Sequence, residues 1–121
     1  MTSVADEPWR LHLISDDQVE LHIDLYEESI EVPGMEMFGK MNGYLGGSLY
    51  DVWTVTSFKI KSDKAVTLRA SNDLGGDAQE ISLRQETDST WVMQFEGGNV
   101  VRKLKGKKLV KVPDRYVMKR K

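Results

Sequence analysis

Apolar and polar residues alternate with a period of two along most of the chain, which is typical of β-strands that bury one face. Residues 18–26 (QVELHIDLY) and residues 9–14 (WRLHLI) both show this alternation. A turn over residues 15–17 would join them, pair Leu13 with Val19 and keep both apolar faces on one side. The pattern predicts an antiparallel hairpin at the start of the chain.

Four further hairpins follow with the same parity, across turns at 62–64, 71–77, 87–89 and 97–98. A one-residue slip in any of them would turn an apolar face toward water, so this agreement favours one common core. The expected pairings are, in chain order, Ile60 with Val66, Phe58 with Leu68, Thr56 with Ala70, Leu68 with Ile81, Val66 with Leu83, Leu83 with Met93, Ile81 with Phe95, Phe95 with Val100, Met93 with Arg102 and Trp91 with Leu104.

Helical periodicity is absent, and the alternating segments give eight or nine strands, depending on whether residues 109–120 form one broken strand or two short ones. Short turns between regularly spaced strands predict an all-β, antiparallel up-and-down meander that closes into a barrel, with a β-sandwich as the alternative. A chain of 121 residues fits a single β-barrel domain over 1–121.

Composition removes several classes of function. The chain has no cysteine, which excludes disulfides and thiolate chemistry. No apolar run approaches the ~20 residues that span a bilayer, so no transmembrane segment is expected. The start, MTSVADEPWR, is polar and unlike a leader, so we expect a cytosolic protein or one from which a leader was removed.

Charge is distributed unevenly. Residues 102–121 contain ten Lys or Arg and one acidic residue, whereas residues 1–101 contain seven basic and eighteen acidic residues. In a closed barrel the first and last strands are neighbours, so the acidic start would pair with the basic end. Because the net charge is -2, nucleic acid is not an expected partner.

Residues 34–47 (GMEMFGKMNGYLGG) would, as a strand, place methionines and glycines on the core face. Methionine is adaptable, and glycine permits close approach, so this wall would suit a cavity; the alternative is core filling at a sharp bend. An arginine on the apolar side would need an anionic partner. The expected ligand-binding residues are Met35, Met37, Met41, Trp91, Met93, Phe95 and Arg102.

The meander, with Trp9 on its first strand and a basic residue near the chain end, resembles the lipocalin-type barrels. In that family a basic side chain packs on this tryptophan, which Arg115 or Arg120 would supply here. Glu7 stands where the family has glycine, and the usual C-terminal helix has no counterpart. The resemblance implies binding or sequestration of a small hydrophobic ligand, often in the periplasm or outside the cell, although a cytoplasmic location stays open.

Two alternatives remain. An exposed aromatic surface with Trp53 and Val55 would make the barrel an interaction module or a homodimer. His12, Glu20 and His22 would share the outer face of the first hairpin and could hold a metal in an enzyme. We assign no catalytic residue, metal or cofactor, because the chain has no Gly-x-Ser-x-Gly and no inward histidine to activate a hydroxyl.

Overall fold

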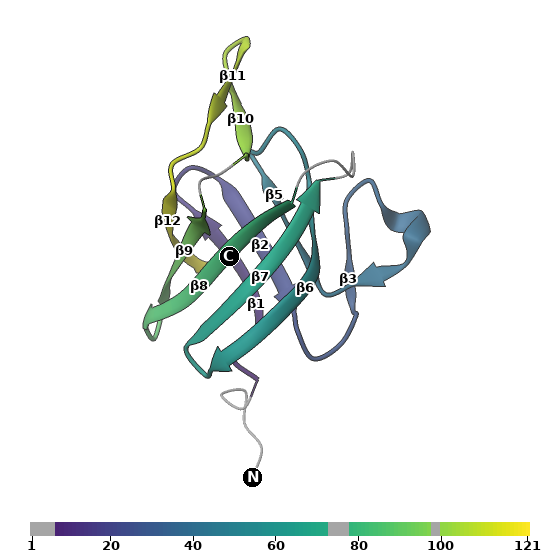
Figure 1. The fold of residues 1–121 in the computed structure, drawn as a ribbon, viewed down its shortest axis with the longest axis vertical. Helices are drawn as coiled ribbons and strands as arrows, with labels where there is room; N and C mark the ends of the chain where they lie inside the picture. Colours follow the sequence, from purple (N-terminus) through teal and green to yellow (C-terminus); the bar gives the residue numbers. More distant parts are fainter. Residues whose placement is uncertain (1–6, 73–77, 98–99) are drawn as a thin grey trace.

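The structure is a computed structural model that describes residues 7–72, 78–97 and 100–121. Within these ranges eight strands form a closed antiparallel barrel, in which each strand pairs with the next barrel strand along the chain and the last pairs with the first (Figure 1). The all-β meander and its closure into a barrel are therefore confirmed, and the sandwich alternative is wrong. The barrel strands are β1 (Arg10–Ser15), β2 (Val19–Asp24), β5 (Gly43–Gly47), β6 (Trp53–Ser62), β7 (Ala65–Asn72), β8 (Ala78–Thr87), β9 (Thr90–Glu96) and β12 (Arg115–Arg120).

The meander is interrupted by two insertions (Figure 1). The first, between β2 and β5, contains β3 (Ile30–Glu31), a 3₁₀ helix (Glu36–Phe38) and β4 (Lys40–Met41), and forms a lobe at the side of the barrel. The second, between β9 and β12, is a hairpin of β10 (Arg102–Lys105) and β11 (Lys108–Lys111) that projects beyond one end of the barrel. No helix in the described ranges is long and apolar enough to cross a membrane.

The barrel interior contains the alternating apolar side chains of all eight strands, as expected from their period of two. The core is rich in large side chains, including all three tryptophans of the chain. The largest fully buried side chains are Trp9, Trp53, Trp91, Leu13, Leu21, Ile23, Leu45, Leu68, Ile81, Leu83, Met93 and Met118.

The predicted registers of the central hairpins are confirmed. β6 pairs with β7, β7 with β8 and β8 with β9, and each register keeps the apolar side chains of neighbouring strands on one side, as expected. The confirmed pairs are Ile60 with Val66, Phe58 with Leu68, Leu68 with Ile81, Val66 with Leu83, Leu83 with Met93 and Ile81 with Phe95.

A β-bulge in β6 overturns the prediction of an exposed aromatic surface. The register with β7 shifts between Val55 and Ser57, so Thr56 is an extra residue, and Ala70 faces Val55 instead of Thr56. The shift inverts the parity upstream of the bulge. Trp53 and Val55 are consequently core residues, each 2% exposed, and cannot form the predicted homodimer contact.

Downstream of the bulge, the apolar face of β6 is partly open to solvent. Phe58 and Ile60 keep the interior-facing register, yet they are 37% and 42% exposed. β5 is short and pairs with β6 only at Trp53 and Thr54, so the later half of β6 has no strand pairing on that side within the described residues. This part of the barrel wall therefore leaves apolar side chains of β6 partly exposed to solvent.

The first hairpin has its predicted faces in a different register. Leu13 pairs with Leu21, two residues further along the chain than expected. The turn lies one residue later, with Gln18 at a φ of 65°, and the Ser15 hydroxyl accepts a hydrogen bond from the backbone N–H of Val19 at 3.1 Å. A shift of two residues preserves parity, which is why the apolar faces still coincide.

The methionine- and glycine-rich stretch is not one strand, which corrects the predicted cavity wall. Gly34 and Gly39 have φ of 81° and 85°, values that favour glycine and end an extended run. Met35 directly precedes the 3₁₀ helix, Met37 lies within it and is 85% exposed, and Met41 is half-buried in β4. These methionines belong to the side lobe, and only β5 from this stretch joins the barrel.

The end of the chain also differs from the prediction. β9 pairs with β12, so Met93 faces Tyr116 and Trp91 faces Met118. Arg102 instead faces Lys111 within the projecting hairpin, because the chain leaves the barrel after β9 and returns only with β12. Of the predicted turns, Gly98 and residues 73–77 lie outside the described residues, as do residues 1–6.

The predicted pairing of acidic and basic ends is confirmed along the closing seam. β1 and β12 are neighbours, and the Lys121 ammonium lies 3.0 Å from a carboxylate oxygen of Glu20. Lys103 in β10 pairs with Asp17 in the β1–β2 turn. Tyr116 donates its hydroxyl to the same Asp17 oxygen at 2.8 Å, and these two donors lower the pKa of Asp17.

Candidate functional site

The structure brings together only part of the predicted ligand site. Trp91, Met93 and Phe95 point into the barrel from β9 and are buried in its core. The three predicted methionines lie in the side lobe, and Arg102 lies on the projecting hairpin. The predicted constellation is therefore not one site.

The β6–β7 and β8–β9 turns lie at the end of the barrel opposite the projecting hairpin (Figure 1). A hollow of about 450 Å³ is lined by residues of these turns. We call it the lower mouth. The segment before β1, the β6–β7 turn, the end of β8 and the last residue of β12 surround it. Its walls combine apolar and charged side chains, and those used below are Leu11, Asp63, Asp88, Trp91 and Arg120.

Arg120 lies over Trp91 at the lower mouth. Alternation along β12 turns Tyr116 and Met118 into the core, and Arg120 shares their face at the end of the strand. Its guanidinium carbon is 4.8 Å from the centroid of the Trp91 ring, a cation–π distance. No carboxylate of the described residues lies within ion-pair distance of Arg120.

Arg10, the other arginine of the lower mouth, already has acidic partners. Its guanidinium contacts carboxylate oxygens of Glu7 and Asp24, both at 3.1 Å, and one of Glu27 at 3.8 Å. Its charge is thus balanced within the protein. Of these two arginines, Arg120 is the one that can receive an anionic group.

Trp9 closes the same end of the barrel. Its indole N–H donates to the backbone oxygen of Ser62 at 3.0 Å, which links the start of β1 to the end of β6. The basic residue expected on Trp9 packs elsewhere, because Arg120 lies over Trp91 and Arg115 is exposed opposite Gln94 on the outer face. The aromatic–basic pair exists, but its tryptophan is the one on β9.

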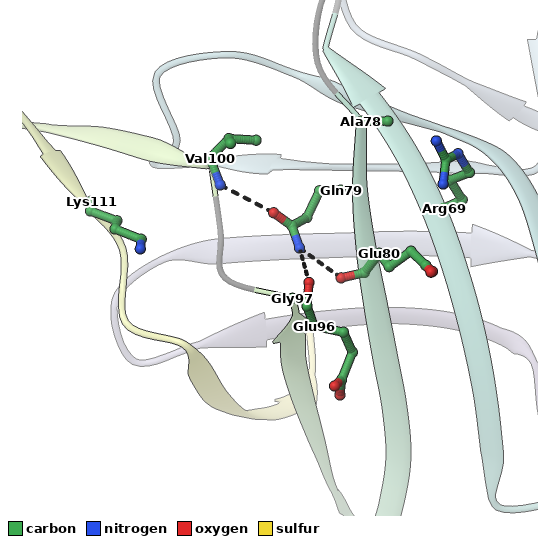
Figure 2. A pocket seen from close by; sticks show the side chains of 8 residues that line it. All are labelled: Arg69, Ala78, Gln79, Glu80, Glu96, Gly97, Val100 and Lys111. Atoms are coloured by element: carbon green, nitrogen blue, oxygen red, sulfur yellow. Dashed lines mark hydrogen bonds between the residues drawn. The ribbon is translucent and has the colours of Figure 1, made fainter.

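A second hollow, of about 490 Å³, lies beside the base of the projecting hairpin (Figure 2). Its central side chain, Gln79, is buried and makes three hydrogen bonds to backbone groups of described residues. The amide nitrogen donates to the oxygens of Glu80 at 2.8 Å and Glu96 at 3.0 Å, and the amide oxygen accepts from the N–H of Val100 at 3.1 Å. Gln79 therefore joins β8 to the segment after β9 and offers a ligand little capacity for hydrogen bonds.

The histidines of the first hairpin stack instead of converging on a common point. The rings of His12 and His22 are parallel, with centroids 4.1 Å apart, and His12 Nε2 lies 2.9 Å from a carboxylate oxygen of Glu20. The hydrogen bonds from His12 and Lys121 lower the pKa of Glu20 despite its partial burial. Burial lowers the pKa of His22, because it disfavours the charged ring. Within the described part of the chain, no three His, Asp or Glu side chains form a group suited to a metal.

Arg120 lines the lower mouth but was not among the expected ligand-binding residues; it was expected only as a candidate partner of Trp9. Its position could have been found from the alternation of RYVMKR, because Tyr116, Met118 and Arg120 share one face. The sequence pattern instead gave the inward role to Arg102, through a register that the inserted hairpin removes.

No protein-family model, curated protein or solved structure matches the chain. The fold and the site define the protein by structure alone, as a small closed antiparallel β-barrel with an arginine and a tryptophan stacked at one mouth.

Proposed function

We propose that the barrel binds a small amphipathic molecule with one acidic group at its lower mouth, without catalysis. The observation that supports this proposal is Arg120, a solvent-exposed cation that lies over the Trp91 indole at the lower mouth, with no acidic partner among the described residues. Binding at one end of a barrel also agrees with the resemblance to lipocalin-type proteins, which implies a small hydrophobic ligand.

The chemistry of the lower mouth defines the ligand class. A volume of about 450 Å³ suits a small ligand. An acidic group would pair with the Arg120 guanidinium, and the apolar part would lie against the lining residues Leu11 and Trp91. Asp63 and Asp88 line the same mouth, beside Lys64, and their carboxylates would repel a second negative charge, so we expect a monoanion to fit better than a dianion.

Thermal-shift and calorimetric titration with octanoate and with octanol tests this proposal. Octanoate should raise the unfolding midpoint more than octanol, because only octanoate has a carboxylate that can pair with Arg120. A ligand at 100 times its Kd stabilises the folded state by about 2.7 kcal/mol. Arg120→Gln should remove the preference for the carboxylate. Arg115→Gln, on the outer face of the same strand, is the matched control and should retain it.

Two results would refute the proposal. One is equal binding of octanoate by the wild type and by Arg120→Gln. The other is the absence of any midpoint shift with carboxylates of several chain lengths at millimolar concentration.

A further inference from the structure

We propose that the hairpin of β10 and β11 binds an anionic lipid surface. This inference concerns the end of the barrel away from the lower mouth and does not depend on the function proposed above (Figure 1). We call residues 102–111 the basic hairpin.

Positive charge is concentrated on the basic hairpin. Its ten residues include six Lys or Arg and no Asp or Glu, on a chain whose net charge is -2. Lys103 is paired with Asp17, but no carboxylate of the described ranges lies within ion-pair distance of Lys105, Lys107, Lys108 or Lys111. Such a local excess of charge attracts an anionic partner.

An exposed apolar pair lies among these charges. Leu104 and Leu109 are paired across the two strands, so their side chains share one face, and they are 56% and 50% exposed. Lys105 and Lys108 pair next to them at the tip. Apolar side chains among lysines can enter the boundary between lipid headgroups and acyl chains while the ammonium groups contact the headgroups.

The base of the basic hairpin is fixed to the barrel. Val101 and Val112 flank it, are buried in the core and are joined by a backbone hydrogen bond of 3.2 Å. Lys103 holds one side through Asp17, and Leu49 forms a bridge to the same strand. At about 3.3 Å per residue, strands of four residues carry the tip roughly 13 Å beyond this base. The tip can therefore reach a flat surface without unfolding the barrel.

Lipid explains the composition better than nucleic acid does. Proteins that bind single strands stack bases on aromatic side chains, and the basic hairpin contains no aromatic residue. Phosphate contacts alone would also leave the exposure of Leu104 and Leu109 unexplained. A lipid interface satisfies both the charges and the leucines.

Co-sedimentation with vesicles tests the proposal, using phosphatidylcholine alone and phosphatidylcholine with 30% phosphatidylserine. The wild type should bind only the anionic vesicles, and binding should weaken at high salt. Each lysine near such a surface contributes about fivefold to partitioning, so Lys107→Gln with Lys108→Gln should weaken binding roughly 25-fold. Lys59→Gln with Lys61→Gln, an equal charge change on the exposed part of β6, should leave binding within about twofold.

The leucines separate lipid from other anions. Leu104→Ser with Leu109→Ser should lower vesicle binding about tenfold and leave the unfolding midpoint nearly unchanged, because both side chains are exposed. Equal loss with the β6 control, or no difference between the two vesicle types, would overturn the proposal. The proposal would also be overturned if a single-stranded oligonucleotide bound more tightly than the anionic vesicles and if Leu104→Ser with Leu109→Ser did not change this binding. Arg120→Gln should not alter vesicle binding, so failure of one proposal is distinguishable from failure of the other.

Discussion

Replacing Asp24 with alanine should destabilise the barrel strongly, because this carboxylate organises the start of the side lobe. Asp24 ends β2 and is 3% exposed. It accepts hydrogen bonds from Arg10 Nε and the Tyr26 N–H, both at 3.1 Å, from the Glu27 N–H at 3.2 Å and from the Ser29 hydroxyl at 2.7 Å. Four donors on one buried carboxylate fix the path of the chain as it leaves the barrel.

The magnitude follows from these contacts. Hydrogen bonds to a charged group contribute about 1.5 to 3 kcal/mol each, but the donors near the surface regain water after the substitution. Arg10 is partly exposed, so its ion pair with Asp24 is screened and contributes little. We expect a loss of about 3 kcal/mol in the free energy of unfolding, or a midpoint lower by roughly 12 °C for a domain of this size.

The pH dependence provides a second measurement. Burial alone would raise the pKa of Asp24, but its hydrogen bonds and the charge of Arg10 outweigh burial and lower the pKa below 3.8. The stabilisation by a carboxylate with a lowered pKa is complete above about pH 4 and is lost as pH falls through the folded-state pKa. The difference between wild type and Asp24→Ala should therefore be constant from pH 7 to 5 and narrow below pH 4.

Urea unfolding at several pH values measures both effects. Glu28→Ala removes an exposed carboxylate from the same loop and should change the free energy of unfolding by less than about 0.5 kcal/mol. Our account of the lobe would be wrong if Asp24→Ala matched this control at pH 7. It would also be wrong if the destabilisation persisted unchanged at pH 3.

Three further outcomes follow from the structure and can be measured by chemical or thermal unfolding. Gly43→Ala should lower the free energy of unfolding by at least about 3 kcal/mol, because the new Cβ would lie 2.4 Å from the backbone oxygen of His22. Gly34 also has a positive φ, of 81°, but open space around it, so Gly34→Ala should lower the free energy of unfolding by only about 1 kcal/mol. Lowering the pH from 7 to 5 should reduce the free energy of unfolding, because burial lowers the folded-state pKa of His22 and the unfolded chain therefore binds a proton more readily. His22→Gln should remove this part of the pH dependence. An NMR titration of His22 with a pKa above 6.5 would contradict the prediction. Phe95→Ala should lower the free energy of unfolding by about 4 kcal/mol, but Phe58→Ala by less than about 2 kcal/mol, because Phe58 is partly exposed at the unpaired part of β6. Equal losses for the two variants would contradict this difference in burial.

The meander was predictable because parity is a local property of each hairpin. Registers such as Ile81 with Phe95 follow from alternation and turn length alone, and an error of two residues in the first hairpin left its faces unchanged. The bulge at Thr56 was not predictable in this way, since TVT continues the alternation through it. One extra residue was sufficient to move Trp53 from the predicted surface into the core.

The candidate site was harder to predict because it depends on the insertions. Alternation in the basic hairpin continues that of β9, so the sequence pattern could not show that Arg102 leaves the barrel. The methionines were misplaced for a similar reason, since positive φ at Gly39 ends an extended run that still alternates in sequence. Arg120 was accessible to the same reasoning, because β12 is a regular barrel strand whose alternation places Arg120 on the face of Tyr116 and Met118.

The position of Trp9 separates binding at the lower mouth from binding deep in the barrel. Its buried indole is hydrogen-bonded to Ser62 across the barrel end, so a ligand that entered the core would have to break this bond and displace the ring. A ligand held by Arg120 would leave the bond intact. The indole N–H resonance of Trp9 should therefore keep its chemical shift and slow exchange when octanoate binds, while that of Trp91, beneath the arginine, shifts. A large change at Trp9 instead would place the ligand inside the barrel and remove Arg120 as its main contact.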